Sequence, residues 1–306
     1  MTFKLKKGDK VGIIAPASKV NEKNFYEGLK IIKEWGLIPI LGKNIFKNDI
    51  SFFSASDKYR AHDLQEFLND NEIKAIWCAR GGYGTQRIIN FIDWSNFLKK
   101  PKLIIGFSDI TFLLNYVSLK FLLPTLHAPN ISSLPEVSPK TLNYLFNFLF
   151  TDNFLYEIEN SSIIYKNKKN NSYIISSKIF GGNLTLFQTL IGVVSNKINK
   201  KNILFFEEIN EPLYRIDRIA HHLLLSQVFK KTTCIILGKF SNTISNDNFP
   251  FDVFTIFKNI MTTSSSIKLI IDNFPIGHEK ENYPIVIGSI LSLKILKDKL
   301  ICCFHF

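Results

Sequence analysis

The chain is organised around the stretch Leu103-Ile104-Ile105-Gly106-Phe107-Ser108-Asp109-Ile110-Thr111. Its first five residues are apolar or small and predict a buried strand, and the apolar positions that follow Ser108 predict a helix. A serine on such a strand-to-helix turn has an exposed hydroxyl beside the unpaired N–H groups of the helix. Ser108 is therefore either a nucleophile on a G-x-S elbow, without the second glycine of G-x-S-x-G, or an ordinary helix N-cap.

The composition describes a globular chain of one large or two ordinary domains. Of its 306 residues, 46% are hydrophobic and 21% are charged, which is enough apolar material for a full core. A net charge of +12 can indicate a nucleic-acid partner. The lysines are scattered, however, and the joint excess of Phe, Lys, Asn and Ile is typical of AT-rich codons. No nucleic-acid partner is therefore expected.

Cysteine usage and the first apolar run favour the cytoplasm. The sequence has no C-x-x-C, and Cys78 and Cys234 lie in apolar runs, so buried thiols in a reducing compartment are expected. The short run 11–18 follows Asp9 and contains Pro16, which favours a first strand over a signal peptide. No run of about 18 apolar residues occurs, so no membrane association is expected.

Apolar runs alternate with helical patterns over the first 130 residues. Strands are expected at 10–16, 37–41, 73–79 and 103–107. This alternation predicts a doubly wound parallel sheet, flavodoxin-like or amidotransferase-like, in which ligands bind at the carboxyl ends of the strands. Three features end strands and should converge there: Pro16-Ala17-Ser18, Arg80-Gly81-Gly82-Tyr83-Gly84 and Ser108-Asp109.

The chain is expected to consist of a nucleophile domain at 1–130, a linker at 131–171 and a smaller C-terminal β/α domain of the swivelling type at 172–306. Closely spaced prolines and a Lys- and Asn-rich tract mark the linker. In the C-terminal domain, Glu207 follows four apolar residues at a strand end, and His278 follows another strand in a Gly-His turn.

Ser108, Glu207 and His278 together supply the groups of a serine hydrolase. A serine attacks only when a base removes its proton, and a histidine has a suitable pKa. The histidine in turn needs an acceptor that fixes its tautomer, and a glutamate serves as well as an aspartate. The ordinary alternatives are a loop histidine at His278 and a solvated strand end at Glu207-Glu208.

The sequence predicts neither a cofactor nor a metal. The turn 80–84 is followed by no Gly-Lys-Ser/Thr and does not fit G-x-G-x-x-G, so a nucleotide cofactor is not expected. His221 and His222 are adjacent on a predicted helix and cannot share a face, which makes them a poor metal site.

Six blocks of the sequence resemble signature blocks of the LD-carboxypeptidase family of serine peptidases. They span nearly the whole chain in the family order: Gly12-Ile13-Ile14-Ala15-Pro16-Ala17-Ser18, Ala79-Arg80-Gly81-Gly82-Tyr83-Gly84, Ile105-Gly106-Phe107-Ser108-Asp109-Ile110-Thr111, Gly181-Gly182-Asn183-Leu184, Phe206-Glu207-Glu208-Ile209-Asn210-Glu211-Pro212-Leu213-Tyr214-Arg215-Ile216-Asp217-Arg218 and Gly277-His278. The segment 279–284 departs from the family's usual continuation after the histidine.

The resemblance implies a role for each residue of the triad. Ser108 would be the nucleophile and His278 the general base and acid. Glu207 would orient His278, with Glu208 as a competitor for that role. The implied oxyanion hole consists of the backbone N–H groups of Gly82, with Gly81 as the alternative, and of Asp109.

The resemblance also implies the reaction. A murein tetrapeptide, or a muropeptide form of it, would lose its terminal D-Ala in cell-wall recycling, and Arg80 and Tyr83 are candidates for substrate contacts. A microcin-type peptidyl or aminoacyl nucleotide is an alternative acyl substrate. A homodimer is expected from the family. The alternative of another class is a basic, non-enzymatic module that binds nucleic acid or a partner.

Overall fold

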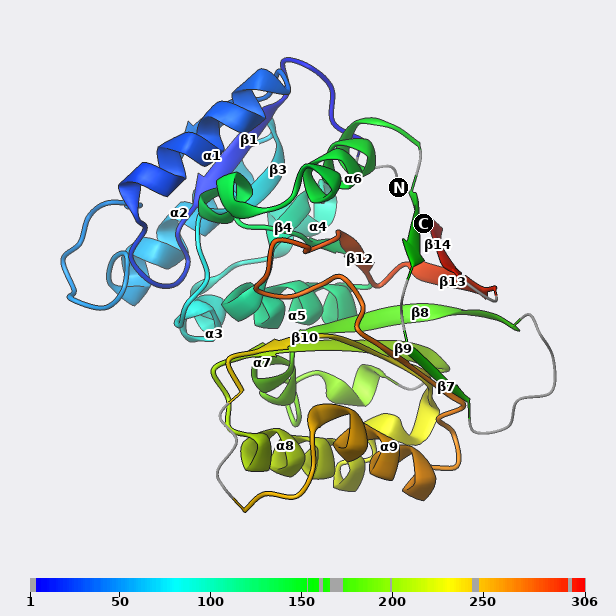
Figure 1. The fold of residues 1–306 in the computed structure, drawn as a ribbon. Coiled ribbons are helices and arrows are strands. Elements are labelled where there is room, and N and C mark those ends of the chain that lie inside the picture. The colour runs from blue at the N-terminus through cyan, green and yellow to red at the C-terminus, as the bar shows by residue number, and fades with distance from the viewer. Residues whose placement is uncertain are drawn as a thin grey trace. The chain divides into compact units, whose positions relative to one another are not determined.

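The computed structural model describes residues 4–152, 154–159, 162–165, 173–198, 200–243, 248–296 and 299–305. The chain forms two compact units (Figure 1). The first contains the described residues of 1–153 together with Tyr283–Ile285, and the second contains the described residues of 154–282 and 286–306.

The first unit holds five strands of a sheet whose order among the described residues is β12-β5-β4-β3-β1-β2, and the sixth strand, β12, begins in this unit at Ile285. The strands are β1 (Lys10–Ile14), β2 (Ile38–Leu41), β3 (Ile73–Cys78), β4 (Leu103–Gly106), β5 (Thr125–His127) and β12 (Ile285–Ile287). The pairs from β2 through β5 are all parallel. The order 2-1-3-4-5 is that of flavodoxin-like sheets, so the predicted doubly wound fold is confirmed.

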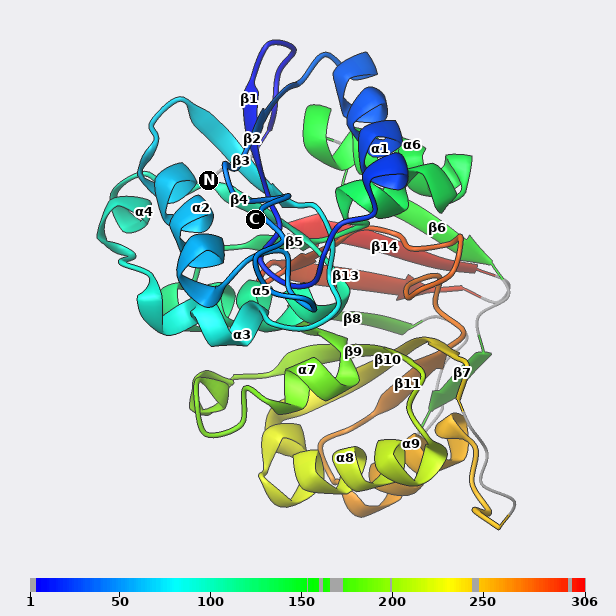
Figure 2. The same ribbon diagram turned by 90° about the vertical axis from the view of Figure 1, so that its left-hand side faces the viewer.

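Helices cover both faces of this sheet (Figure 2). They are α1 (Glu22–Glu34), α2 (Asp57–Asn69), α3 (Thr85–Ile88), α4 (Ser95–Lys99), α5 (Thr111–Phe121) and α6 (Pro139–Phe150), with 3-10 turns η1 (Ile89–Phe91), η2 (Ser108–Ile110) and η3 (Ile131–Glu136). Gly12 of β1 lies so close to Phe67 of α2 that a Cβ atom would fall 2.5 Å from its ring. On the opposite face, Trp77 of β3 packs against Trp35, which follows α1.

The expected linker at 131–171 contains regular structure. Its first part, η3, packs on α1, where a Cβ atom on Gly28 would lie 1.9 Å from the carbonyl oxygen of Ile131. Helix α6 follows, with Ser138 accepting a hydrogen bond from the N–H of Thr141 as its N-cap. The Lys- and Asn-rich tract 166–171 and the expected domain start at residue 172 lie outside the described residues.

The second unit has a larger, mixed sheet, with eight strands among the residues described, in the order β6-β14-β13-β8-β9-β10-β11-β7. The strands are β6 (Leu155–Glu159), β7 (Ser162–Tyr165), β8 (Tyr173–Asn183), β9 (Asn202–Ile209), β10 (Thr232–Ser241), β11 (Leu269–Asp272), β13 (Ile290–Ile295) and β14 (Lys299–His305). Strands β8 to β11 are parallel, and the outer pairs are antiparallel. Strand β9 is almost wholly buried, as its apolar sequence predicts.

Three helices lie on one face of the second sheet (Figure 1). They are α7 (Leu184–Gln188), α8 (Leu213–Leu225) and α9 (Val253–Thr263), with 3-10 turns η4 (Ser195–Lys197) and η5 (Val228–Lys231). Among the described helices of both units, none combines the length and the apolar character needed to cross a bilayer.

Candidate active site

Ser108 occupies a strained turn between β4 and α5. Its φ angle is +64°, a left-handed conformation that a side chain with a Cβ atom rarely adopts. A serine N-cap has an extended backbone instead, and the N-cap position of α5 is Ile110. The N-cap interpretation of Ser108 is therefore wrong, and the turn has the backbone strain of a nucleophile elbow.

Asn130 holds the elbow through the backbone of Phe107, a role that no local sequence motif indicates. The Oδ1 atom of Asn130 accepts a hydrogen bond from the N–H of Phe107 at 3.2 Å, and its Nδ2 atom donates to the carbonyl of Phe107 at 3.5 Å. A Cβ atom on Gly106 would lie 2.9 Å from both Asn130 Oδ1 and Ile110 Cγ2. The first glycine of the motif is thus required by close packing.

The turn at 81–84 lies directly against the elbow. A Cβ atom on Gly81 would fall 3.0 Å from the Cβ of Ser108 and 3.3 Å from the backbone nitrogen of Asp109. Ser18 fixes this turn, because its N–H donates to the Gly81 carbonyl at 3.2 Å and its Oγ accepts the N–H of Tyr83 at 3.1 Å. The three strand-end features that the sequence predicted to converge do so within the first unit.

The two predicted substrate contacts flank Gly81 and Gly82 in this turn. Arg80 is exposed, and its guanidinium donates to the carbonyl of Lys19. Tyr83 is 42% exposed, and its ring centroid lies 5.8 Å from that of Phe53 and 6.4 Å from that of Phe52. Both side chains are thus accessible and anchored beside the elbow.

Glu207 and His278 form a hydrogen-bonded pair in the second unit. The Nδ1 atom of His278 lies 2.8 Å from Oε2 of Glu207, and the glutamate is fully buried near the end of β9. The histidine follows Gly277, whose φ of +136° only glycine adopts without strain. The side chain of Asn282 accepts the N–H of Gly277 at 3.3 Å, so the unusual segment 279–284 supports the turn that carries His278.

Glu208 has a different structural task. Because consecutive strand residues point to opposite faces, it faces away from Glu207. It accepts hydrogen bonds from Asn183 Nδ2 at 2.6 Å and from the backbone N–H groups of Thr185 and Ile209, both at 2.9 Å. Glu208 thus caps the start of α7, and Glu207 is the glutamate that contacts His278.

Electrostatics favour the protonated form of His278. Burial lowers the pKa of the imidazole, but the charge and hydrogen bond of Glu207, aided by the charge of Glu208, outweigh burial and raise the pKa above its ordinary value. Burial, followed by the charge of Glu207, raises the pKa of Glu208. The pair therefore stabilises the imidazolium that a general base becomes after it accepts a proton.

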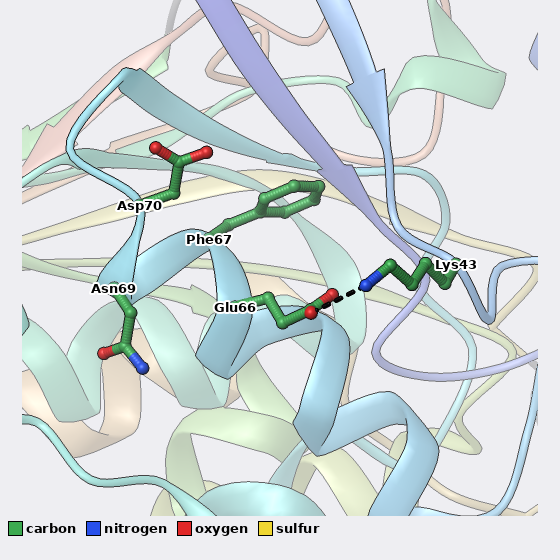
Figure 3. A pocket seen from close by; sticks show the side chains of 5 residues that line it. All are labelled: Lys43, Glu66, Phe67, Asn69 and Asp70. Carbon is green, nitrogen blue, oxygen red and sulfur yellow. Dashed lines mark hydrogen bonds and ion pairs between the residues drawn. The ribbon is translucent and has the colours of Figure 1, made fainter.

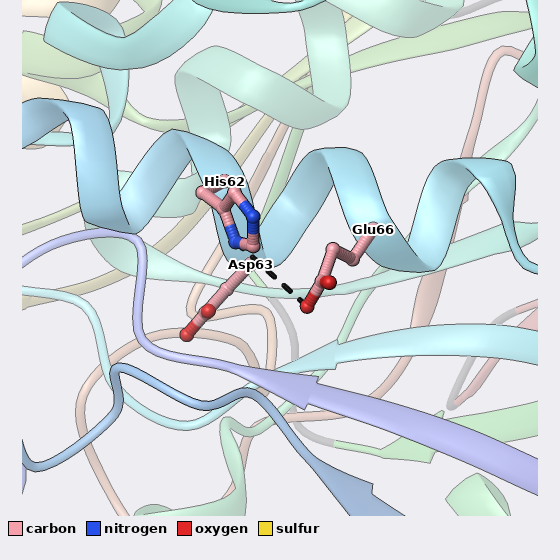
Figure 4. Close-up of side chains that lie close together, drawn as sticks. All are labelled: His62, Asp63 and Glu66. Atoms are coloured by element: carbon pink, nitrogen blue, oxygen red, sulfur yellow. Dashed lines mark ion pairs between the residues drawn. The ribbon is translucent and has the colours of Figure 1, made fainter.

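Two other polar features involve residues of α2. A pocket of about 480 Å³ is lined by Lys43, Glu66, Phe67, Asn69 and Asp70, and the ammonium of Lys43 lies 2.9 Å from Glu66 (Figure 3). Among the described residues, one cluster has metal-ligand types within reach of each other: His62, Asp63 and Glu66 (Figure 4). Asp63 already accepts two hydrogen bonds from Asn44, so this cluster has a structural explanation.

Comparisons with known proteins identify the family of the chain. Models of the LD-carboxypeptidase N-terminal and C-terminal domains match residues 11–128 and 176–293. The "Probable murein peptide carboxypeptidase" of Bacillus subtilis is 34% identical over 78% of this chain and 75% of its own length. The murein tetrapeptide carboxypeptidase of Pseudomonas aeruginosa is 26% identical over 76% of this chain and 77% of its own length. The structure of MccF in complex with glutamyl sulfamoyl guanosine has a TM-score of 0.85 at 20% identity, over 100% of this chain and 99% of that one.

The chain belongs to the LD-carboxypeptidase family. It is therefore an enzyme, a serine-type carboxypeptidase, and the alternative of a non-enzymatic binding module is set aside. The likeness to MccF shows the shared two-domain fold.

Proposed function

We propose that the enzyme releases the terminal D-Ala of a murein tetrapeptide, or of a muropeptide that carries it, in cell-wall recycling. The strained elbow at Ser108 is the main support for this proposal. A serine with a φ of +64° beside a Gly-Gly turn costs folding free energy, and such backbone strain is typical of functional sites. Ser108 is the nucleophile, and His278, oriented by Glu207, is the general base and acid. The backbone N–H groups of Gly82 and Asp109 form the oxyanion hole.

The proposed reaction has two halves. With Nδ1 of His278 engaged by Glu207, Nε2 takes the proton of Ser108 while Oγ attacks the carbonyl carbon of the scissile bond. The tetrahedral oxyanion collapses, the C–N bond breaks and the imidazolium protonates the leaving amine of D-Ala. A water molecule then gives a proton to His278 and attacks the ester carbonyl. The bond from the carbonyl carbon to Ser108 Oγ breaks, His278 returns the proton to Oγ, and the tripeptide leaves with a free carboxylate. This proposal requires Ser108 Oγ and His278 Nε2 to meet.

The names of the relatives support a murein peptide as the substrate, since the relatives from two organisms are named for murein peptides. A second candidate is an acylated nucleotide, because MccF binds glutamyl sulfamoyl guanosine. The relative named for a murein peptide in Bacillus subtilis is 34% identical to this chain and MccF is 27% identical, which favours the tetrapeptide. Parallel turnover assays on both substrate classes distinguish them.

The direct test incubates the enzyme with L-Ala-D-Glu-meso-diaminopimelate-D-Ala and detects tripeptide and D-Ala by mass spectrometry. The wild-type enzyme should release D-Ala, and Ser108→Ala should not. Ser95→Ala is a matched control, because Ser95 also begins a helix and its Oγ donates to Asp93 at 2.6 Å. Unchanged D-Ala release by Ser108→Ala would refute the proposal.

We further propose that the enzyme acts in the cytoplasm and forms a homodimer. All four cysteines are free, and Cys78, Cys234 and Cys302 are buried, which fits a reducing compartment. Light scattering on the purified protein tests the homodimer, and cell fractionation tests the compartment.

A further inference from the structure

The turn that supplies one oxyanion donor is held by side chains from three separate elements. Ser18, after β1, binds the backbone of Gly81 and Tyr83, as described above. Arg60 of α2 is only 1% exposed, and it donates to the carbonyl of Gly84 at 2.9 Å and to that of Ala55 at 3.0 Å. The third side chain is that of Asp109, from the elbow itself.

Asp109 joins the two halves of the oxyanion hole. Its Oδ2 accepts the N–H of Thr85 at 2.8 Å and also the Thr85 hydroxyl. Its own backbone nitrogen lies 3.3 Å from the Cβ position of Gly81. Asp109 thus offers one donor N–H from its backbone. Through its carboxylate it also holds Thr85, which directly follows the turn whose Gly82 offers the other donor N–H.

The buried carboxylate of Asp109 contributes little to the stability of the fold. Asp109 has no exposed surface, and burial raises its pKa although the hydrogen bonds from Thr85 oppose that shift. Among the described residues, no hydrogen-bond partner reaches its Oδ1. The helix that it caps, α3, has only four residues, so little helical structure depends on the cap. A buried acid in such a place stabilises a fold weakly but fixes geometry strongly.

We propose that the Asp109 carboxylate is a positioning residue that sets the spacing between the Gly82 and Asp109 N–H groups. This inference rests on the proposed function, because it assumes that these two groups bind the oxyanion. It extends the role of Asp109 from its backbone to its side chain. It also makes Thr85, which no sequence motif singled out, the partner through which the carboxylate acts.

The test compares Asp109→Asn with Asp63→Asn in kcat and KM for D-Ala release. Asp63 of α2 is a matched control. Like Asp109 it is a buried aspartate, 2% exposed, that accepts a hydrogen bond from the backbone N–H of a distant residue, Asn44, at 2.9 Å. Loss of one oxyanion donor costs about 10²- to 10³-fold in kcat, so a displaced donor should cost about 10- to 100-fold. We expect this loss in Asp109→Asn with KM within about two-fold of the wild-type value, and an unchanged kcat in Asp63→Asn.

A second variant keeps the inference falsifiable if Asp109→Asn does not fold. Thr85→Val removes the hydroxyl donor to Asp109 but keeps the backbone N–H, so a smaller fall in kcat at constant KM is expected.

The outcomes separate this inference from the function on which it rests. A wild-type enzyme without Ser108-dependent D-Ala release would overturn both. A wild-type enzyme that releases D-Ala, together with an Asp109→Asn or Thr85→Val variant whose kcat matches that of Asp63→Asn, would overturn the role of the carboxylate alone.

Discussion

Replacement of Glu207 by glutamine should change the pH dependence of the enzyme in a defined direction. The substitution keeps the shape of a fully buried side chain but removes the charge that lies 2.8 Å from His278 Nδ1. Because Glu207 raises the pKa of His278, its loss lowers that pKa. Neutral His278 is the required base, so the acidic limb of kcat/KM should move to lower pH in Glu207→Gln.

The maximum activity of Glu207→Gln should fall at the same time. A hydrogen bond to a charged group contributes about 1.5–3 kcal/mol. At about 1.36 kcal/mol for each tenfold change, its loss in the transition state lowers kcat/KM roughly 10- to 150-fold. Glu208→Gln is the control: it removes a neighbouring buried carboxylate that caps α7, and it should move the acidic limb less.

The difference in folding stability between the wild-type enzyme and Glu207→Gln should depend on pH. A raised pKa of His278 means that its pairing with Glu207 stabilises the fold fully below about pH 6.5, the ordinary histidine value, and less as the pH rises through the raised pKa. Denaturant titrations should therefore show a greater loss of stability for Glu207→Gln at pH 6 than at pH 9. An acidic limb that stays in place or moves to higher pH would refute this reasoning.

Two further substitutions probe the backbone of the elbow and its neighbour. In denaturant titrations, Ser108→Gly should be more stable than Ser108→Ala by about 0.5–1 kcal/mol. Relief of the left-handed strain, about 1–2 kcal/mol, exceeds the cost of the extra conformational entropy that glycine has in the unfolded chain. Equal or lower stability of Ser108→Gly would contradict the strain at a φ of +64°. Gly82→Ala should lower kcat at least tenfold, because its Cβ atom would lie 2.3 Å from Ser18 Oγ. Gly8→Ala is the control, because Gly8 has a φ of +90° and no atom would lie within 4 Å of its added Cβ. It should lose stability through backbone strain but keep its activity. Equal activity of Gly82→Ala and Gly8→Ala would contradict the importance of the contact between residue 82 and Ser18.

Local pattern was sufficient to predict β1 to β4 and β9, and the residues at their ends. The apolar runs before Ser108 and Glu207 form β4 and β9, since a fully buried parallel strand is read directly from an unbroken apolar sequence. The choice of Glu207 over Glu208 was predicted from family resemblance. In the structure, the alternation of β9 gives that choice its physical reason.

The parts that the sequence did not reveal depend on contacts between distant segments. The left-handed backbone of Ser108 is imposed by neighbours such as Asn130, whose role no local motif announces. Arg60 reads as an ordinary charged helix residue, yet it is buried against backbone carbonyls of two loops. The closely spaced prolines from Pro124 onward predict irregular chain, whereas Pro139 begins α6, where proline is well tolerated.

We propose that Ser108 and His278 act as one catalytic group. A double-mutant cycle on D-Ala release from the tetrapeptide tests it most directly, with Ser108→Ala, His278→Ala and the double variant. Each single variant should lose at least about 10³-fold in kcat/KM, and the double variant should be no slower than the slower single variant, because residues that act as a unit are strongly non-additive. Losses that multiply in the double variant, or substantial activity in His278→Ala, would contradict the claim.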